Sequence, residues 1–167
     1  KVFKDKTSVP AYISRVLNMA PSDDALKGLR LVVDCANGAF SKILPEIFKK
    51  LGAGVIALSN TPDGYNINRD CGSQHTEHLS EVVVDSHAHL GIAVDGDGDR
   101  LIVVDDRGER IDGDQIIAFL PTYLKKNNML DGDGVVATIW SNLGLEKYLH
   151  ALSLNFYRTP VGERYVM

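Results

Sequence analysis

The hydrophobic positions of the chain form two kinds of pattern, namely short continuous runs and stretches with helical spacing. The first stretch of helical spacing has apolar residues at Ile13, Val16, Leu17 and Ala20, after a serine that suits an N-cap and a proline in the first turn. This pattern predicts a helix over residues 8–20. The following stretch, "PSDDALKG", predicts a linker.

The next part of the chain, residues 28–111, shows a βαβ pattern that two further strands extend. An apolar run ends in the turn of "LRLVVDCANGA", "SKILPEIFKKLG" ends on a glycine as many helices do, and "AGVIALSN" is a second run. After the polar loop "TPDGYNINRDCGSQH", "TEHLSEVVVDSHAH" predicts a helix and "LGIAV" a strand. The stretch "RLIVVDDRGERI" predicts a strand antiparallel to the preceding one, and then a turn. Together these elements predict a complete α/β unit, with a mixed, mainly parallel sheet flanked by helices.

A second unit begins at residue 112. The stretch "DGDQIIAFLPTYLKKN" opens on aspartates that suit a helix N-terminus, and "GVVATIWS", "LGLEKYLHAL" and "NFYRTPVG" predict a strand, a helix and a strand. We expect residues 112–167 to be the first part of a truncated α/β domain, and residues 1–27 to be a helix and linker from a preceding domain. An unpaired strand edge and exposed apolar helix faces would favour self-association of such a fragment.

The composition excludes several classes of function. The chain has 167 residues, of which 44% are hydrophobic and 24% charged, as is usual for a globular protein with a core. Its net charge is -4 and it has no long run of Lys or Arg, which argues against a nucleic-acid partner. No apolar run is long enough to predict a membrane span. The two cysteines lack CxxC spacing and fit a reducing compartment, so we expect a cytoplasmic location.

The stretch "LGIAVDGDGDRLIVVDD" carries the most specific chemistry. It places Asp95, Asp97 and Asp99 after an apolar strand with only glycines between them, and these glycines let the backbone fold the three side chains to one side. Two unit charges ~4 Å apart repel by about 4 kcal/mol at an effective dielectric near 20, so the loop needs a compensating cation. Three carboxylates with water or phosphate oxygens suit Mg²⁺. The adjacent Arg100 is a candidate catalytic residue that would bind a substrate phosphate.

Other interpretations of this loop differ in strength. An EF-hand would need glycine and glutamate where the chain has Arg100 and Asp106, and it would need flanking helices instead of strands, so it is excluded. A phosphatase of the haloacid dehalogenase type stays open, with Asp95 as nucleophile and Asp97 as acid and base, although Asp99 then has no role. A solvated acidic hairpin turn is the structural alternative.

The sequence resembles a known family over nearly its whole length. The stretch "DGDGDR" between an apolar strand and "LIVVD" looks like the metal-binding loop of the α-D-phosphohexomutases. The stretches "LVVDCANGA", "PDGYNINRDCGS.H", "GDQII", "T.WSNLGLE" and "VGERYV" are similar to the phosphoglucosamine mutase branch of that family. The commoner form of the last motif is "VGDRYV". Glu163 replaces its aspartate here and keeps the carboxylate.

The resemblance implies a four-domain enzyme that interconverts glucosamine 6-phosphate and glucosamine 1-phosphate, on the way to cell-wall precursors, through a phosphoserine on its first domain. Mg²⁺ would be held by Asp95, Asp97, Asp99 and a phosphoserine oxygen, and would stabilise the phosphoryl group in transfer. The chain would supply domain 2 and the first part of domain 3, and its partners would be the remaining domains and the phosphosugar. Without the phosphoserine loop we expect it to be inactive alone. Sister branches that act on mannose or glucose phosphates stay open.

Other positions are weaker candidates. Gly162, Glu163 and Arg164 follow a predicted strand, where open α/β sheets bind ligands, so we treat them as candidate substrate residues. Trp140 and Tyr148 are interpreted as aromatic residues of the core or of an interface.

Two further sets of polar residues are better explained by local structure than by chemistry. Asp34, Asn37 and Gly38 lie at a strand-to-helix turn, where a ligand-facing role is open, but a helix cap and a tight turn account for them equally well. His87 and His89 are expected at a helix terminus on the surface.

Overall fold

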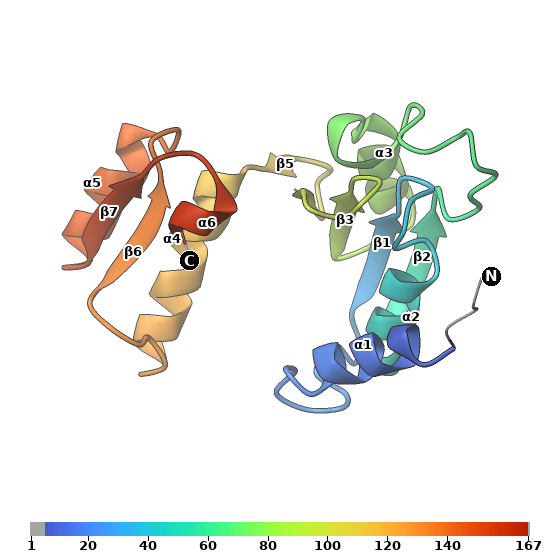
Figure 1. The fold of residues 1–167 in the computed structure, drawn as a ribbon, viewed down its shortest axis with the longest axis horizontal. Helices are drawn as coiled ribbons and strands as arrows, with labels where there is room; N and C mark the ends of the chain where they lie inside the picture. Colours follow the sequence, from blue (N-terminus) through green and yellow to red (C-terminus); the bar gives the residue numbers. More distant parts are fainter. Residues whose placement is uncertain (1–5, 167) are drawn as a thin grey trace, which may run out of the picture. The chain divides into compact units, whose positions relative to one another are not determined.

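The structure is a computed structural model, and it describes residues 6–166. The chain divides into two compact units, Lys1–Arg110 and Ile111–Met167 (Figure 1). Within the described part of the chain, no helix is both long and apolar enough to cross a bilayer.

The first unit is built on a five-stranded sheet with the strand order β2-β1-β3-β4-β5. Strand β1 pairs in parallel with β2 and β3, and β3 pairs with β4 in antiparallel fashion, which confirms the predicted mixed, mainly parallel sheet. The elements are α1 (Ser8–Leu17), β1 (Arg30–Asp34), α2 (Ile43–Lys50), β2 (Gly54–Leu58), the 3-10 helix η1 (Gly72–Gln74), α3 (Glu77–Asp85), β3 (Leu90–Val94), β4 (Leu101–Asp105) and β5 (Arg110–Ile111).

Helices cover both faces of this sheet. Successive side chains of a strand point to opposite sides, so neighbouring residues of β1 pack against different helices. Val32 of β1 packs with Leu79 and Val83 of α3 on one face. Leu31 and Val33, its neighbours in sequence, pack on the other face in a cluster that includes residues of α2. Figure 1 shows α2 and α3 on either side of β1. Each buried aliphatic side chain contributes about 1.5–3 kcal/mol, so these two layers stabilise the unit that carries the acidic loop.

Helix α1 belongs to the same compact unit. Its buried residue Ile13 packs against Ile47 of α2 and against Leu51, which follows that helix. The predicted helix over residues 8–20 therefore exists, although its regular part ends at Leu17. The assignment of residues 1–27 to a preceding domain, and the boundary at residue 111, stay predictions.

The second unit contains a parallel pair of strands with helices. Its elements are α4 (Gly113–Lys126), β6 (Gly134–Thr138), α5 (Leu143–Ala151), β7 (Asn155–Thr159) and α6 (Glu163–Val166). Asp112 and Gln115 form a capping box at the start of α4, as the aspartates of this stretch suggested. The strand that we predicted over residues 155–162 is shorter, because Pro160 cannot donate to a ladder and Gly162 has a φ of 136°.

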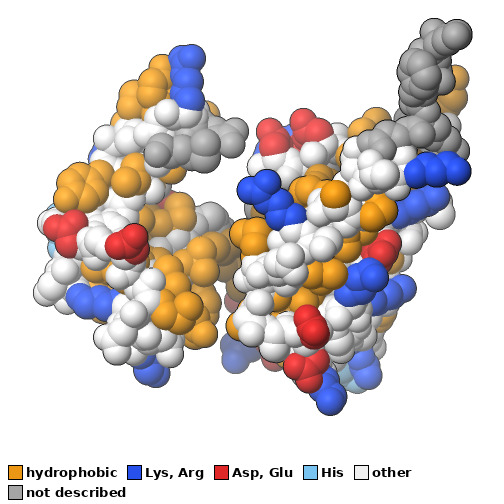
Figure 2. Space-filling model, turned by 60° about the horizontal axis from the view of Figure 1, so that its bottom comes forward, with side chains coloured by type: hydrophobic (Ala, Val, Ile, Leu, Met, Phe, Trp, Pro, Cys, Tyr) orange, Lys and Arg blue, Asp and Glu red, His pale blue; other side chains and the backbone are white. Residues whose placement is uncertain are grey.

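One face of β6 and β7 is packed. Leu145 and Leu149 of α5 and the nearby Leu154 form a buried cluster against Val135 and Phe156. The next residue of each strand, Val136 or Tyr157, has an exposed side chain. Figure 2 shows hydrophobic side chains at the surface of the molecule. Self-association through such surfaces stays a prediction.

Two aromatic residues that the sequence singled out in the second unit, Trp140 and Tyr148, are not part of its core. The side chain of Trp140 is 80% exposed, and Tyr148 is 42% exposed with its hydroxyl 3.1 Å from that of Thr122. A core position is therefore excluded for both residues, and Trp140 lies in the loop after β6. The alternative interpretation, a position in an interface, stays a prediction.

Candidate metal centre

The acidic loop, residues 95–100, joins β3 to the antiparallel β4. The register pairs Val94 with Leu101, so the loop closes directly on the last pair of the hairpin. Asp95, Asp97 and Asp99 each offer one carboxylate oxygen, and these three oxygens all lie within 4.8 Å of one another. Asp95 is buried, whereas Asp97 and Asp99 are exposed. The structure thus brings together the three carboxylates that the sequence singled out.

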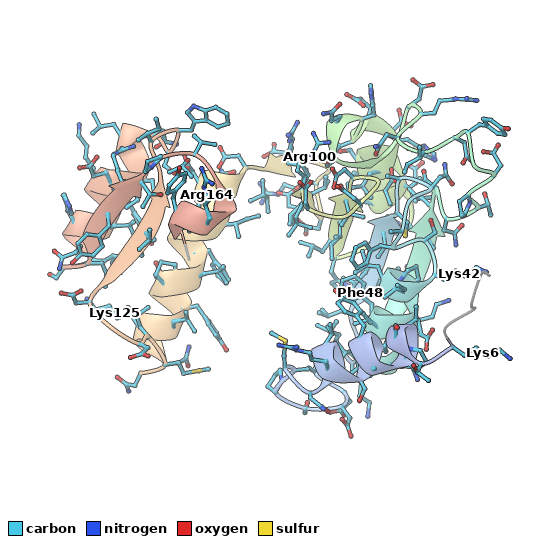
Figure 3. All side chains as sticks on the ribbon, in the orientation of Figure 1. Lys6, Lys42, Phe48, Arg100, Lys125 and Arg164 are labelled. Atoms are coloured by element: carbon cyan, nitrogen blue, oxygen red, sulfur yellow. The ribbon has the colours of Figure 1, made fainter. Side chains whose placement is uncertain are left out.

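Arg100 holds the buried carboxylate at both oxygens. Its backbone N–H donates to Asp95 Oδ1 at 3.0 Å, and its Nε donates to Asp95 Oδ2 at 2.8 Å. The same Nε lies 3.6 Å from Asp99 Oδ1. The side chain of Arg100, which is labelled in Figure 3, is half-exposed. Its exposed fraction is 53%, against only 4% for that of Asp95. Part of the positive charge that the loop requires is therefore supplied by the chain itself.

The carboxylates of this loop have unlike affinities for protons. Burial raises the pKa of Asp95, but hydrogen bonds from the backbone and side chain of Arg100, a contact with Asp99 and the Arg100 charge outweigh it and lower the pKa to about 2. The pKa of Asp99 is raised by its hydrogen bond to Asp95, by the Asp95 charge and by the Asp97 charge. Asp95 is thus a permanent anion at neutral pH, and a bound cation would relieve the repulsion on Asp99.

Glycine is required at several positions in and near the loop, because a side chain there would clash with a neighbouring segment. A Cβ on Gly38 would lie 2.2 Å from the carbonyl oxygen of Gly96, and this same oxygen accepts a 2.8 Å hydrogen bond from the backbone N–H of Ala39. Gly98 has a φ of 78°, and a Cβ there would lie 2.3 Å from the ring of Phe40. The acidic loop is therefore held against residues 38–40, the segment that follows β1.

The long loop after β2 also supports this site, through Ile67 and Asn68, two residues that were not predicted to do so. A Cβ on Gly96 would lie 2.6 Å from the side chain of Ile67 and 2.9 Å from that of Asn68. The backbone N–H of Asn68 donates to the carbonyl of Ala36 at 2.9 Å. An isoleucine within the otherwise polar stretch "YNINRD" was the available signal for this packing.

Asp34 and Asn37 have structural partners, as expected, but Asp34 is not a helix cap. The buried Asp34 carboxylate accepts one bond from the backbone N–H of Ala36 and one from that of Gly72, both at 2.9 Å. Asn37 Oδ1 accepts from the backbone N–H of Thr61 at 3.1 Å. Helix α2 begins later in the chain, so both side chains fix loops and not a helix end.

The two histidines follow α3, as predicted for a helix terminus at the surface. His87 and His89 are both exposed. They precede β3, whereas the acidic loop follows it, so the length of this strand separates the histidines from the three carboxylates. His89 Nδ1 accepts a 2.9 Å hydrogen bond from the backbone N–H of Arg30, which gives it a structural role.

The candidate substrate residues belong to the second unit. Gly162 precedes the short helix α6, and the guanidinium of Arg164 lies 4.7 Å from the ring centre of Tyr165 and donates to its hydroxyl at 2.7 Å (Figure 3). The side chain of Glu163 lies outside the described part of the structure. A role of Gly162, Glu163 and Arg164 toward the substrate stays a prediction.

Comparison with known proteins assigns the two units to consecutive domains of one family. Residues 10–108 match the phosphoglucomutase/phosphomannomutase family, alpha/beta/alpha domain II, and residues 112–167 match alpha/beta/alpha domain III of the same family. The chain belongs to this family. Curated relatives named phosphoglucosamine mutase include those of Parvibaculum lavamentivorans, 48% identical over 156 residues, and Bradyrhizobium diazoefficiens, 50% identical over 156 residues. Each alignment covers 93% of this chain but only 35% of the relative.

Solved structures of the family share the fold. A phosphoglucomutase/phosphomannomutase family protein from Burkholderia thailandensis superposes with a TM-score of 0.77 at 24% identity, covering 95% of this chain and 34% of that one. A putative phosphomannomutase from Thermus thermophilus superposes with a TM-score of 0.73 at 18% identity, covering 92% of this chain and 36% of that one. The chain therefore spans about a third of the length of the family members that it matches.

Proposed function

We propose that this chain is part of a phosphoglucosamine mutase and supplies its Mg²⁺-binding loop. The observation that carries the proposal is the convergence of the Asp95, Asp97 and Asp99 oxygens within 4.8 Å, in the unit that matches domain II of the family. The relatives that are about half identical over 93% of the chain bear that enzyme's name, which supports glucosamine phosphates over the mannose and glucose phosphates of sister branches. A cytoplasmic location is proposed with it.

The donor set fits the cation. Carboxylate oxygens are the ligands that Mg²⁺ prefers, and three of them on one short loop leave other positions to water and to the phosphorylated serine of the complete enzyme. When bound, Mg²⁺ supplies charge that stabilises a phosphoryl group in transfer. Asp95, Asp97 and Asp99 would hold it, the backbone N–H of Arg100 orients Asp95, and the half-exposed guanidinium of Arg100 would bind substrate phosphate.

Mg²⁺ titration of the chain, followed by calorimetry and amide NMR, tests the proposed site. We expect weak binding, with shifts centred on residues 95–100, and still weaker binding for Asp97→Asn. Asp106→Asn is the matched control, because it removes the same charge from an exposed position at the other end of β4. Equal binding by the two variants would show that the cation is not held by the acidic loop.

A second experiment separates a mutase from a phosphatase. With Mg²⁺ and glucosamine 6-phosphate or p-nitrophenyl phosphate, we expect neither isomerisation nor phosphate release from the chain alone, because positioning of donor, metal and acceptor carries this catalysis. In the full-length protein, Asp95→Asn should abolish activity. A beryllium fluoride adduct or acyl-phosphate on Asp95 would instead identify that residue as a phosphatase nucleophile.

A further inference from the structure

Arg100 uses the same carboxylate that we assign to the metal. We propose that the Arg100 guanidinium and Mg²⁺ compete for Asp95, so that Arg100 weakens metal binding, and that metal binding releases the guanidinium toward phosphate. This inference rests on the proposed function, because it takes Asp95, Asp97 and Asp99 as the metal ligands.

The geometry separates two roles of Arg100. Its backbone N–H holds Asp95 Oδ1 at 3.0 Å whatever its side chain does, whereas its Nε occupies Oδ2 at 2.8 Å. The Nε also lies 3.6 Å from Asp99, a second proposed ligand. A dication that binds these oxygens is therefore adjacent to a permanent positive charge. Because the guanidinium and the dication repel each other, contact of Asp95 Oδ2 with one of them disfavours its contact with the other.

Once the guanidinium has left Asp95, it is available to bind a phosphate group. Its side chain is already 53% exposed, and its planar set of N–H donors matches the oxygens of a phosphate. Because metal binding breaks the contact that engages Arg100, it makes phosphate binding more favourable, and by linkage phosphate makes metal binding more favourable. The Arg100–Asp95 pair thus couples the loading of the cation to that of the substrate.

Substitution of Arg100 tests this directly. In the 167-residue chain, Arg100→Gln should bind Mg²⁺ roughly 5- to 15-fold more tightly, because one charge ~5 Å from a dication is removed in a largely aqueous setting. The ratio should shrink at high ionic strength. Arg107→Gln is the matched control, because the five-residue strand β4 puts that side chain roughly 15 Å away and the Mg²⁺ affinity should not change.

A second measurement follows the guanidinium itself. The Arg100 Nε–H resonance in a ¹⁵N NMR spectrum should shift with Mg²⁺ along the same saturation curve as the amides of residues 95–99. If Arg100→Gln lowers the urea midpoint so far that folding is incomplete, Arg100→Lys provides the test. It keeps the charge on a more mobile side chain and should bind Mg²⁺ more tightly than the wild type.

The outcomes are distinct. Equal or weaker Mg²⁺ binding by folded Arg100→Gln would overturn the competition and leave Arg100 as a residue that only orients Asp95. Absence of Mg²⁺-dependent shifts at residues 95–99 in both the wild type and Arg100→Gln would refute the metal site, and with it the proposed function.

Discussion

Substitution of Gly38 by alanine should displace the acidic loop without touching any carboxylate. The new Cβ would lie 2.2 Å from the carbonyl oxygen of Gly96, and contacts below 3.0 Å are essentially never seen for real Cβ atoms. The two segments must therefore separate by about 0.8 Å, the difference between these distances. Gly96 lies between Asp95 and Asp97, so the movement reaches two of the proposed ligands.

The energetic cost of this change has two parts. Overpacking of a close contact costs about 1–3 kcal/mol, and weakening of the 2.8 Å hydrogen bond from the Ala39 N–H to the Gly96 oxygen adds about 0.5–1.5 kcal/mol. A total of about 2–4 kcal/mol should lower the urea midpoint by roughly 1–2 M. Mg²⁺ requires near-ideal coordination, so its affinity should fall about tenfold or more.

Urea unfolding and Mg²⁺ titration of Gly38→Ala are best compared with those of Gly54→Ala. A Cβ on Gly54 would meet the Leu29 carbonyl oxygen at 3.7 Å, an ordinary contact, so the same substitution in the same unit should have little effect on either measurement. Equal midpoints and equal Mg²⁺ affinities for the two variants would refute the argument that residues 38–40 position the acidic loop.

Four further substitutions test other parts of the structure. Asp95→Asn should destabilise the chain by about 2 kcal/mol at pH 7, because the pKa of the Asp95 carboxyl is lowered to about 2 in the folded state. In urea unfolding at a series of pH values, this difference from the wild type should disappear as the pH falls from ~4 to ~2 and the carboxylate becomes protonated. Asp34→Ala leaves two backbone N–H groups without their carboxylate, so we expect a loss of about 2–5 kcal/mol in the same assay, and a loss below 1 kcal/mol would contradict the assigned role. Leu149→Ala should lower the free energy of unfolding by about 2–5 kcal/mol because Leu149 is fully buried, whereas Trp140→Ala should change the thermal midpoint little. A larger loss of stability for Trp140→Ala than for Leu149→Ala would show that the core of the second unit is misassigned.

Features that depend on neighbouring residues could be predicted from the sequence. The three carboxylates alternate with glycine on one hairpin, so their convergence follows from a few adjacent residues. The antiparallel pairing of β3 and β4 was evident for the same reason, because one short loop joins them.

Features that depend on distant segments were not predicted. The contacts of Gly38 with Gly96 and of Phe40 with Gly98 join segments that are far apart in sequence, and a glycine alone does not indicate what approaches it. A helix cap or a tight turn was expected around Asp34, but its second partner, Gly72, is supplied by a distant loop. A core position was one of the two interpretations of Trp140, but its side chain is 80% exposed, because it lies in a loop that no neighbouring element covers within the described residues.

The antiparallel hairpin of β3 and β4 has a consequence for how the protein folds. Strand β1 can pair with β3 only after the whole segment between Leu31 and Leu90 has been brought together, whereas β3 and β4 are joined by residues 95–100 alone. Local hairpins close in about 1–10 μs, much faster than pairings across long segments. We therefore expect the carboxylates to be gathered early, so that their mutual repulsion opposes the fastest pairing of the sheet. We expect divalent cations to accelerate refolding of this unit, through a step that precedes any catalysis.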